Sequence, residues 1–152
     1  MASVADSLAE AGYVLPEAPS ALGSYVPAVR AGALVWTAGQ LPLLGGRLLT
    51  TGIVGSAVTS ETAVRCAEQA ALNALAAAST ACDLDRVVRV VKVTGYVASA
   101  VDFVGQPAVI DGASAVMLAA FGDAGRHARV AVGVAALPLG APVEVEVVLE
   151  LG

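Results

Sequence analysis

The segment Val87–Val97 constrains the fold of this chain more than any other. It reads VVRVVKVTGYV, a run dominated by β-branched valines. Such residues lose side-chain freedom in a helix and pack well on a pleated surface. The run therefore predicts a central strand, which needs further strands beside it and an apolar layer against it.

Alternation, turn residues and helix caps predict the other elements. The expected strands are Tyr25–Val29 and Ala33–Thr37, joined as a hairpin through Gly32, a short Arg47–Thr50, and the C-terminal pair Ala128–Ala135 and Val143–Leu149. The expected helices are Ser3–Ala11, Ser60–Ala81 with Thr59 as N-cap, and Ala108–Phe121 stopped by Gly122. This order predicts an α+β fold in which two helices cover one face of a mixed sheet.

The second face of that sheet has no predicted cover. Hydrophobic residues make up 57% of the 152 residues and charged residues only 14%. A single domain of this size buries only about 68–70% of its unfolded surface. We therefore expect a largely apolar bare face and a homo-oligomer in which partner subunits cover it.

Composition and charge exclude several classes of protein. A chain this apolar collapses rather than staying disordered, and charged or strongly polar residues interrupt every stretch that would otherwise cross a membrane. The net charge of −5, without a basic run, argues against nucleic-acid binding. Asp6 and Glu10 precede any Lys or Arg, unlike a signal peptide, and Cys66 and Cys82 are read as reduced thiols. These features predict a cytoplasmic protein.

The domain organisation follows from the linker Leu15–Gly23, which is rich in proline and small residues. We expect residues 1–22 to form an N-terminal extension and residues 23–152 to form a single domain.

Few residues offer chemistry. His127 is the only histidine, which excludes a multi-histidine metal site, and we interpret it as a loop or strand-edge residue. Strand alternation places Arg129 on one face with Ala131 and Gly133, where its guanidinium fork suits a carboxylate. Glu144 and Glu146 share a face of the last strand. The alternative is a surface arginine and the solvated face of an edge strand.

An ordered set of segments resembles a known family. The segments are Gly23-Ser24-Tyr25-Val26-Pro27-Ala28-Val29, Ala38-Gly39-Gln40-Leu41-Pro42, the helix with Asn73, Val90-Val91-Lys92 with Phe103 downstream, Ala128-Arg129, Leu137-Pro138 and Val143-Glu144-Val145-Glu146. Together they resemble the RidA (YjgF) family of reactive-intermediate deaminases, also labelled L-PSP endoribonuclease, over about residues 20 to 150. The N-terminal extension and the segment GDAGRHAR resemble a divergent branch.

The resemblance implies a chorismate-mutase-like fold assembled as a homotrimer with a central β-barrel and active sites at the subunit clefts. It implies hydrolysis of 2-aminoacrylate and related enamines or imines to a 2-keto acid and ammonia, without metal or cofactor. Arg129 would bind the substrate carboxylate, Glu144 would activate water, and Tyr25 would orient the substrate. Tyr25 could equally pack at the subunit edge.

Several residues depart from the family pattern. Ala131, Gly133 and Ala38 stand where the family commonly has cysteine, glutamate and serine, and Pro27 replaces glutamine. The family's asparagine near the second helix has no secure counterpart, although Asp111 lies in that region. The residues that line the expected pocket are thus smaller and more apolar than those of typical family members. Such a pocket suits a larger or more hydrophobic imine.

The spacing of Arg129 and Glu144 adds a geometric expectation. If residues 137–142 form a symmetric hairpin loop, Glu144 lies opposite Ala135, roughly 20 Å along the strand from Arg129 at ~3.3 Å per residue. We therefore expect the two residues to meet across a subunit interface, or through a bulge.

Two other functions stay open. A non-catalytic protein would bind small carboxylates or 2-keto acids in the same inter-subunit cleft. Ribonuclease activity, which the family label suggests, is disfavoured by the acidic charge and the single histidine.

Overall fold

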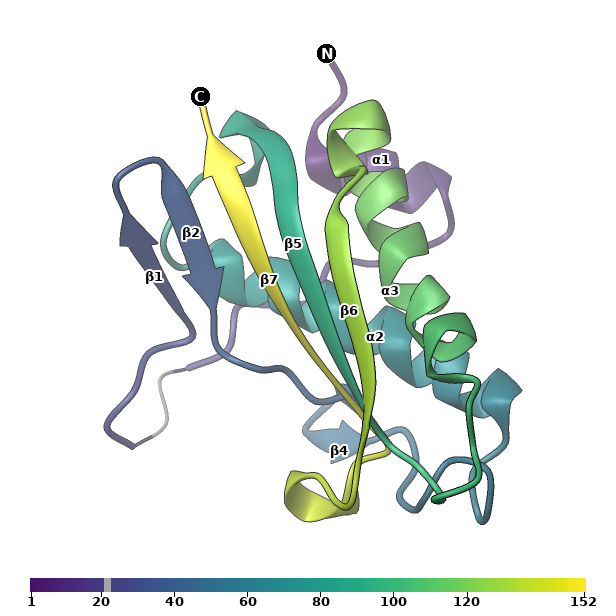
Figure 1. Cartoon of the computed structure of the whole chain (residues 1–152). Helices are drawn as coiled ribbons and strands as arrows, with labels where there is room; N and C mark the ends of the chain where they lie inside the picture. The colour runs from purple at the N-terminus through teal and green to yellow at the C-terminus, as the bar shows by residue number, and fades with distance from the viewer. Residues whose placement is uncertain (21–22) are drawn as a thin grey trace.

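A computed structural model describes residues 1–20 and 23–152 (Figure 1). Its main sheet has five strands in the order β1-β2-β7-β5-β6, and β3 and β4 form a separate two-stranded sheet. The strands are β1 (Ala28–Ala31), β2 (Leu34–Thr37), β3 (Leu43–Leu44), β4 (Arg47–Leu48), β5 (Val87–Ala98), β6 (Ala128–Val134) and β7 (Val143–Leu151). The valine-rich run is β5 and lies between β7 and β6, so its predicted place inside the sheet is confirmed.

The C-terminal strands differ from the expected hairpin. β6 pairs in parallel with β5, whereas β7 pairs antiparallel with the other side of β5. Parallel neighbours need a crossover connection, and the helix between β5 and β6 supplies it. The condition of a symmetric hairpin between β6 and β7 is therefore not met, because β5 separates them.

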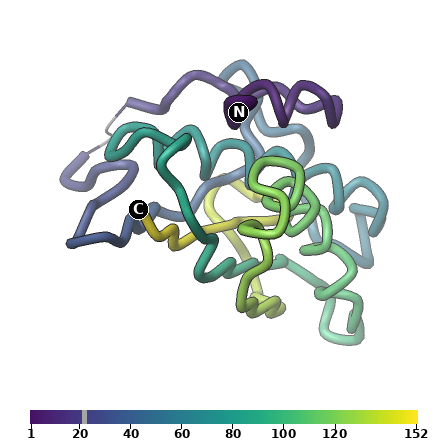
Figure 2. The backbone as a smooth tube through the Cα atoms, turned by 90° about the horizontal axis from the view of Figure 1, so that it is seen from above, coloured from purple at the N-terminus to yellow at the C-terminus, as the bar shows by residue number. Residues whose placement is uncertain are grey.

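The helices are α1 (Val4–Glu10), α2 (Ser60–Ala78) and α3 (Gln106–Phe121), with short 3-10 helices η1 (Leu84–Arg86), η2 (Gly122–Gly125) and η3 (Pro138–Gly140). α2 and α3 cover one face of the sheet, and α1 packs on α3, as the view from above also indicates (Figures 1 and 2). Leu8 of α1 is fully buried. The predicted linker Leu15–Gly23 includes residues 21 and 22, which lie outside the described residues. The division of the chain at residue 22 stays a prediction.

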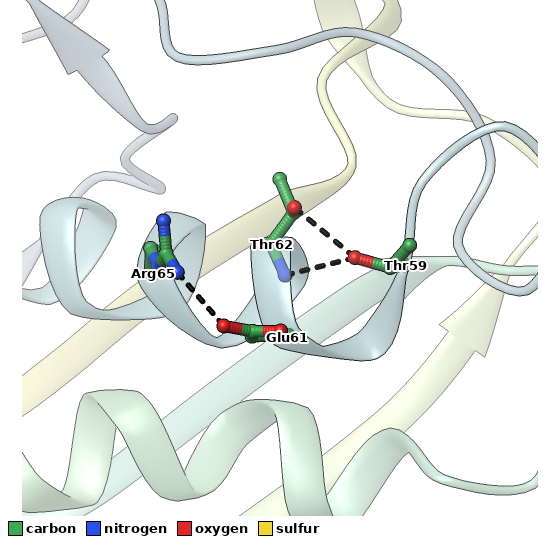
Figure 3. Close-up of polar contacts among 4 residues, drawn as sticks. All are labelled: Thr59, Glu61, Thr62 and Arg65. Atoms are coloured by element: carbon green, nitrogen blue, oxygen red, sulfur yellow. Dashed lines mark hydrogen bonds and ion pairs between the residues drawn. The ribbon is translucent and has the colours of Figure 1, made fainter.

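The start of α2 follows the predicted capping pattern (Figure 3). The hydroxyl of Thr59 accepts a hydrogen bond from the backbone N–H of Thr62 at 3.2 Å. One turn further on, Arg65 donates to Glu61 at 2.8 Å across the exposed surface. These contacts fix the beginning of the helix that covers the middle of the sheet.

The end of α2 comes three residues earlier than the predicted Ala81. The hydroxyls of Ser79 and Thr80 donate to the carbonyls of Ala76 and Ala77, both at 2.7 Å. Hydroxyls that bind nearby carbonyls compete with continued helical hydrogen bonding. The next helix, α3, begins two residues before the predicted Ala108, and Pro107 lies in its first turn.

The core lies between the sheet and the helices. Its fully buried strand residues include Val35, Val93, Val97, Val143, Val145 and Leu149. Gly95 allows α3 to lie close to β5, because a side chain there would meet Ile110.

Both cysteines are free, and burial raises the pKa of the Cys66 thiol to about 11. Residues 106–125 are long and apolar enough to cross a membrane, but 44% of the apolar stretch within them is buried inside the protein.

The opposite face of the sheet is open in the described part of the chain, as predicted (Figure 1). It is mixed rather than largely Val, Ala and Gly. Its residues include Trp36, Lys92, Thr94, Tyr96, Val130, Val132, Glu144 and Glu146. The expectation of a nearly apolar face was wrong because β7 is an interior strand that still places its glutamates on this side.

Candidate functional site

Arg129 is the second residue of β6 and points toward the helices. Its Nη1 donates to Asp111 Oδ1 at 2.7 Å and to Ser114 Oγ at 3.1 Å. Both partners lie on α3, which packs against β6. The Arg129 side chain is 24% exposed. The guanidinium is therefore held between strand and helix, with a carboxylate already bound to it.

Ser114 and His127 extend this cluster. Ser114 Oγ lies 2.9 Å from His127 Nε2, and His127 Nδ1 lies 2.6 Å from the carbonyl oxygen of Gly125. Because a carbonyl only accepts hydrogen bonds, Nδ1 carries a proton, and in the neutral form of the ring Nε2 accepts from the serine hydroxyl. Both ring nitrogens of His127 thus have hydrogen-bond partners. The residue lies just before β6, at the strand edge where the sequence predicted it.

A surface cavity of about 380 Å³ adjoins the cluster. It is lined by Ser114, Leu118, Arg126, His127 and Arg129. Arg126 is mostly exposed and makes a 3.4 Å ion pair with Asp123. The cavity therefore combines a hydroxyl, an imidazole and two guanidinium groups with one apolar wall.

Glu144 lies on the open face, directly opposite Tyr96 of β5. The Tyr96 hydroxyl donates to Glu146 Oε1 at 3.0 Å. Burial, and then the charge of Glu146, raise the pKa of Glu144 above its ordinary value. The Glu144 carboxylate packs against Gly39, where no side chain would fit. Glu144 is a half-buried carboxylate that takes up protons more readily than an exposed glutamate.

Arg129 and Glu144 are not brought together within one protomer. Along β5, Val93 pairs with Arg129 and Tyr96 pairs with Glu144. Positions three apart on a strand face opposite ways, and Val93 is buried under the helices whereas Tyr96 is on the open face. The backbones are offset by roughly 10 Å along the sheet and roughly 10 Å across it. The two residues were expected roughly 20 Å apart along one hairpin. They instead lie on strands on either side of β5.

Tyr25 lies just before β1, at the sheet edge opposite β6. The residue is 59% exposed. Four strand spacings separate β1 from β6, which is roughly 19 Å. Tyr25 and Arg129 therefore lie at opposite edges of the sheet, and Arg129 and Glu144 lie on opposite faces of it.

Asn73 holds the loop that carries Gly39. Its Nδ2 donates to the carbonyls of Leu41 and Leu43, both at 2.9 Å. Gln40 is in turn bound through its backbone to Val145, with N···O distances of 2.8 and 2.9 Å. These bonds keep Gly39 beside Glu144.

The family follows from comparison with known proteins. Residues 5–151 match the family described as "YjgF/chorismate mutase-like, putative endoribonuclease". This chain belongs to that family. The membership expected from the ordered sequence segments is thus confirmed, as is the α+β fold.

Three relatives of this YjgF-family chain span nearly its whole length. Protein TCP17 of Trypanosoma cruzi is 42% identical over 152 residues, covering 97% of this chain and 94% of that protein. The crystal structure of Atu1372 from Agrobacterium tumefaciens, described as of unknown function, is 42% identical with a TM-score of 0.89, covering 98% and 92%. A "putative endoribonuclease" from Shewanella oneidensis is 34% identical with a TM-score of 0.93, covering 99% and 100%.

Gly133 departs from the residue expected from the YjgF-family pattern, and Gln106 of α3 occupies the adjacent space. A side chain at position 133 would meet Ser99 Oγ and Gln106 Nε2. Gln106 Nε2 donates to Ser99 Oγ at 3.2 Å and to the carbonyl of Phe103 at 2.8 Å. An amide from the helix thus stands beside the strand position where the sequence resemblance led us to expect a glutamate.

Sequence reasoning missed Ser114. Two signals could have found it in this YjgF-family chain. Ser114 follows Asp111 by three positions and so shares its helix face. His127 precedes Arg129 by two positions, which places both on one side of an extended segment.

Proposed function

We propose that this YjgF-family protein hydrolyses reactive enamines and imines such as 2-aminoacrylate to a 2-keto acid and ammonia. The site is shared by two subunits of a homotrimer with a central β-barrel. Arg129 of one subunit binds the substrate carboxylate, and Glu144 of its neighbour activates water. Tyr25 orients the substrate. The reaction uses no metal or cofactor and takes place in the cytoplasm.

The contact between Arg129 and Asp111 carries the proposal. The guanidinium already binds a carboxylate at 2.7 Å, on a side chain held in place by Ser114. Asp111 is itself 69% exposed, so a substrate carboxylate can replace it without opening the core. Charge-assisted hydrogen bonds of this kind are among the stronger polar contacts in proteins.

The environment of Glu144 supports its role as a base. Burial and the charge of Glu146 raise its pKa, which makes its carboxylate a better proton acceptor. The substrate carbon of an imine is already electrophilic. A positioned water and a nearby base therefore supply what the reaction still needs.

The placement of the residues supports a site between subunits. Arg129 lies on one edge strand, and Tyr25 precedes the other. Glu144 lies on the open face, among exposed side chains such as Trp36 and Val132. A neighbouring protomer that packs on the open face and on the β6 edge would cover these exposed side chains. It would also bring its own Glu144 toward Arg129.

The chemistry then has two steps. The Glu144 carboxylate takes a proton from water as the oxygen bonds to the imine carbon and passes this proton to the imine nitrogen, giving a neutral carbinolamine. The same carboxylate then takes the proton of the carbinol hydroxyl and gives it to the amino nitrogen as the C–N bond breaks, so that ammonia leaves and the C=O of the 2-keto acid forms. Arg129 holds the carboxylate through both steps.

The direct test generates 2-aminoacrylate in situ with a serine dehydratase and follows its loss in the presence of this protein. We expect a faster loss than in buffer, with ammonia and pyruvate as products. Tight binding of pyruvate without faster loss would instead establish the non-catalytic carboxylate-binding function. RNA cleavage that persists without Arg129 and Glu144 would indicate a contaminating ribonuclease.

A further inference from the structure

We propose that Ser114 is the nucleophile of a second activity, the cleavage of small carboxylic esters that carry an anionic group, with His127 as its base. The imine hydrolysis described above uses neither residue as a reacting group. The inference therefore goes beyond that function and does not rest on it.

The first support is the distance between nucleophile and base. Ser114 Oγ lies 2.9 Å from His127 Nε2, within the range that proton transfer requires. A serine hydroxyl is a weak nucleophile until such a base accepts its proton. Ser79, by contrast, donates to a backbone carbonyl at 2.7 Å, which is a far weaker base than imidazole.

The second support is the orientation of the imidazole. The Nδ1–H group of His127 donates to the Gly125 carbonyl at 2.6 Å. This bond fixes the tautomer in which Nε2 has a free lone pair facing Ser114. Gly125 has no room for a side chain, because one there would strike the backbone of Met117. The backbone that orients the histidine is thus packed tightly on α3.

The third support is the cavity, which indicates the class of ester. Arg126 and Arg129 line the same cavity of about 380 Å³ as the Ser114–His127 pair. Their charges suit a carboxylate on the ester and the oxyanion that forms during attack. The volume and the single apolar wall at Leu118 suit a short acyl chain.

The reaction balances with water as the only co-reactant. Ser114 Oγ bonds to the ester carbonyl carbon while its proton passes to His127 Nε2. The bond to the leaving oxygen breaks as that proton is returned to it, which releases the alcohol and leaves acyl-Ser114. Water then gives a proton to Nε2 and its oxygen to the acyl carbon, and Oγ regains a proton as the free acid leaves.

The test incubates the purified protein with p-nitrophenyl acetate and locates the acetyl group by peptide mass spectrometry. We expect an early release of p-nitrophenol and acetylation at Ser114. Acetylation only elsewhere, such as at Lys92 or the N-terminus, would overturn the proposal. This readout uses the unaltered protein and so does not depend on whether a variant folds.

Substitutions in the Ser114–His127 pair, together with a matched control, test the two assigned roles separately. Ser114→Ala should reduce the release of p-nitrophenol to background, and His127→Gln should slow it by roughly 100-fold. The matched control, Ser79→Ala, should retain the rate of the unaltered protein. Thermal unfolding of each variant identifies any loss that comes from misfolding.

The charge preference tests the substrate class. The mono-p-nitrophenyl ester of succinate should react faster than the acetate, and Arg126→Ala should remove most of that difference. Equal rates for the two esters with the unaltered protein would overturn the assignment to anionic esters.

Discussion

Arg129 and Glu144 point to opposite faces of one sheet, on strands that flank β5. A three-carbon imine cannot reach across a sheet to touch both. If Arg129 binds the carboxylate and Glu144 is the base, as we propose, one protomer supplies one of these groups to a given substrate and a second protomer supplies the other. This relationship leads to the following predictions.

Arg129→Ala should lower kcat/KM for imine hydrolysis by roughly 10- to 150-fold, because hydrogen bonds to charged groups contribute about 1.5–3 kcal/mol. Arg129→Lys should recover only part of the lost kcat/KM, because the lysine ammonium lacks the planar fork of donors that a guanidinium offers. The control is Arg65→Ala, which breaks an exposed pair with Glu61 and should leave kcat/KM unchanged. Steady-state kinetics measure all three, and equal losses in Arg129→Ala and Arg65→Ala would contradict the role of Arg129.

Asp111→Asn should strengthen the binding of 2-oxo acids. The Asp111 carboxylate occupies Arg129 at 2.7 Å and competes with a ligand carboxylate. Because the aspartate is exposed, the gain should be modest, about 2- to 5-fold in Kd by calorimetry. Asp123→Asn, which alters an exposed pair with Arg126, is the control. Weaker binding by Asp111→Asn would mean that Asp111 helps to hold the ligand.

The pH profile of kcat/KM should report Glu144. The base is the carboxylate form, so activity rises with pH as Glu144 loses its proton. Burial raises this pKa above the ordinary 4.5 for glutamate, and the Glu146 charge raises it further. Glu146→Gln removes the second cause only, and should move the midpoint to lower pH without restoring the ordinary value. A midpoint that stays in place or moves upward would exclude Glu144 as the titrating base.

Asn73→Ala should destabilise the fold more than any of these changes. It removes the side-chain donor from the half-buried carbonyls of Leu41 and Leu43, of which the Leu41 carbonyl keeps the Leu43 N–H at 2.8 Å. An unsatisfied buried group costs about 1–3 kcal/mol, so the free energy of unfolding should fall by roughly 1–3 kcal/mol in urea titrations. Gln69→Ala loses only the 3.1 Å bond to Asn73 Oδ1 and should cost less than half as much. Similar losses would show that the loop does not depend on Asn73.

Alternation along single strands was the most reliable sequence signal. It correctly placed Arg129 on one face with Gly133, and Glu144 with Glu146. It succeeds because neighbouring side chains of a strand alternate by backbone geometry alone. The helix covering the sheet at Ser60 followed equally from a local signal, the Thr59 cap.

Pairing between strands could not be read in the same way. The loop at residues 137–142 has the proline and glycine of a tight turn, yet β6 pairs with β5 instead of β7. Which strands become neighbours depends on the helix that crosses between them, which is a property of the whole fold. The link between Ser114 and His127 was missed for the same reason, since it joins α3 to the segment before β6.

Mixed oligomers test the central claim most directly. Arg129→Ala and Glu144→Gln subunits, each strongly impaired alone, are unfolded together, refolded, and checked for mixed assembly by native mass spectrometry. A site shared by neighbouring subunits should regain imine hydrolysis at roughly one quarter of the sites in a trimer mixed at equal ratio, because some interfaces combine an intact arginine with an intact glutamate. Mixed trimers that remain as inactive as the separate variants would contradict a site built from two subunits.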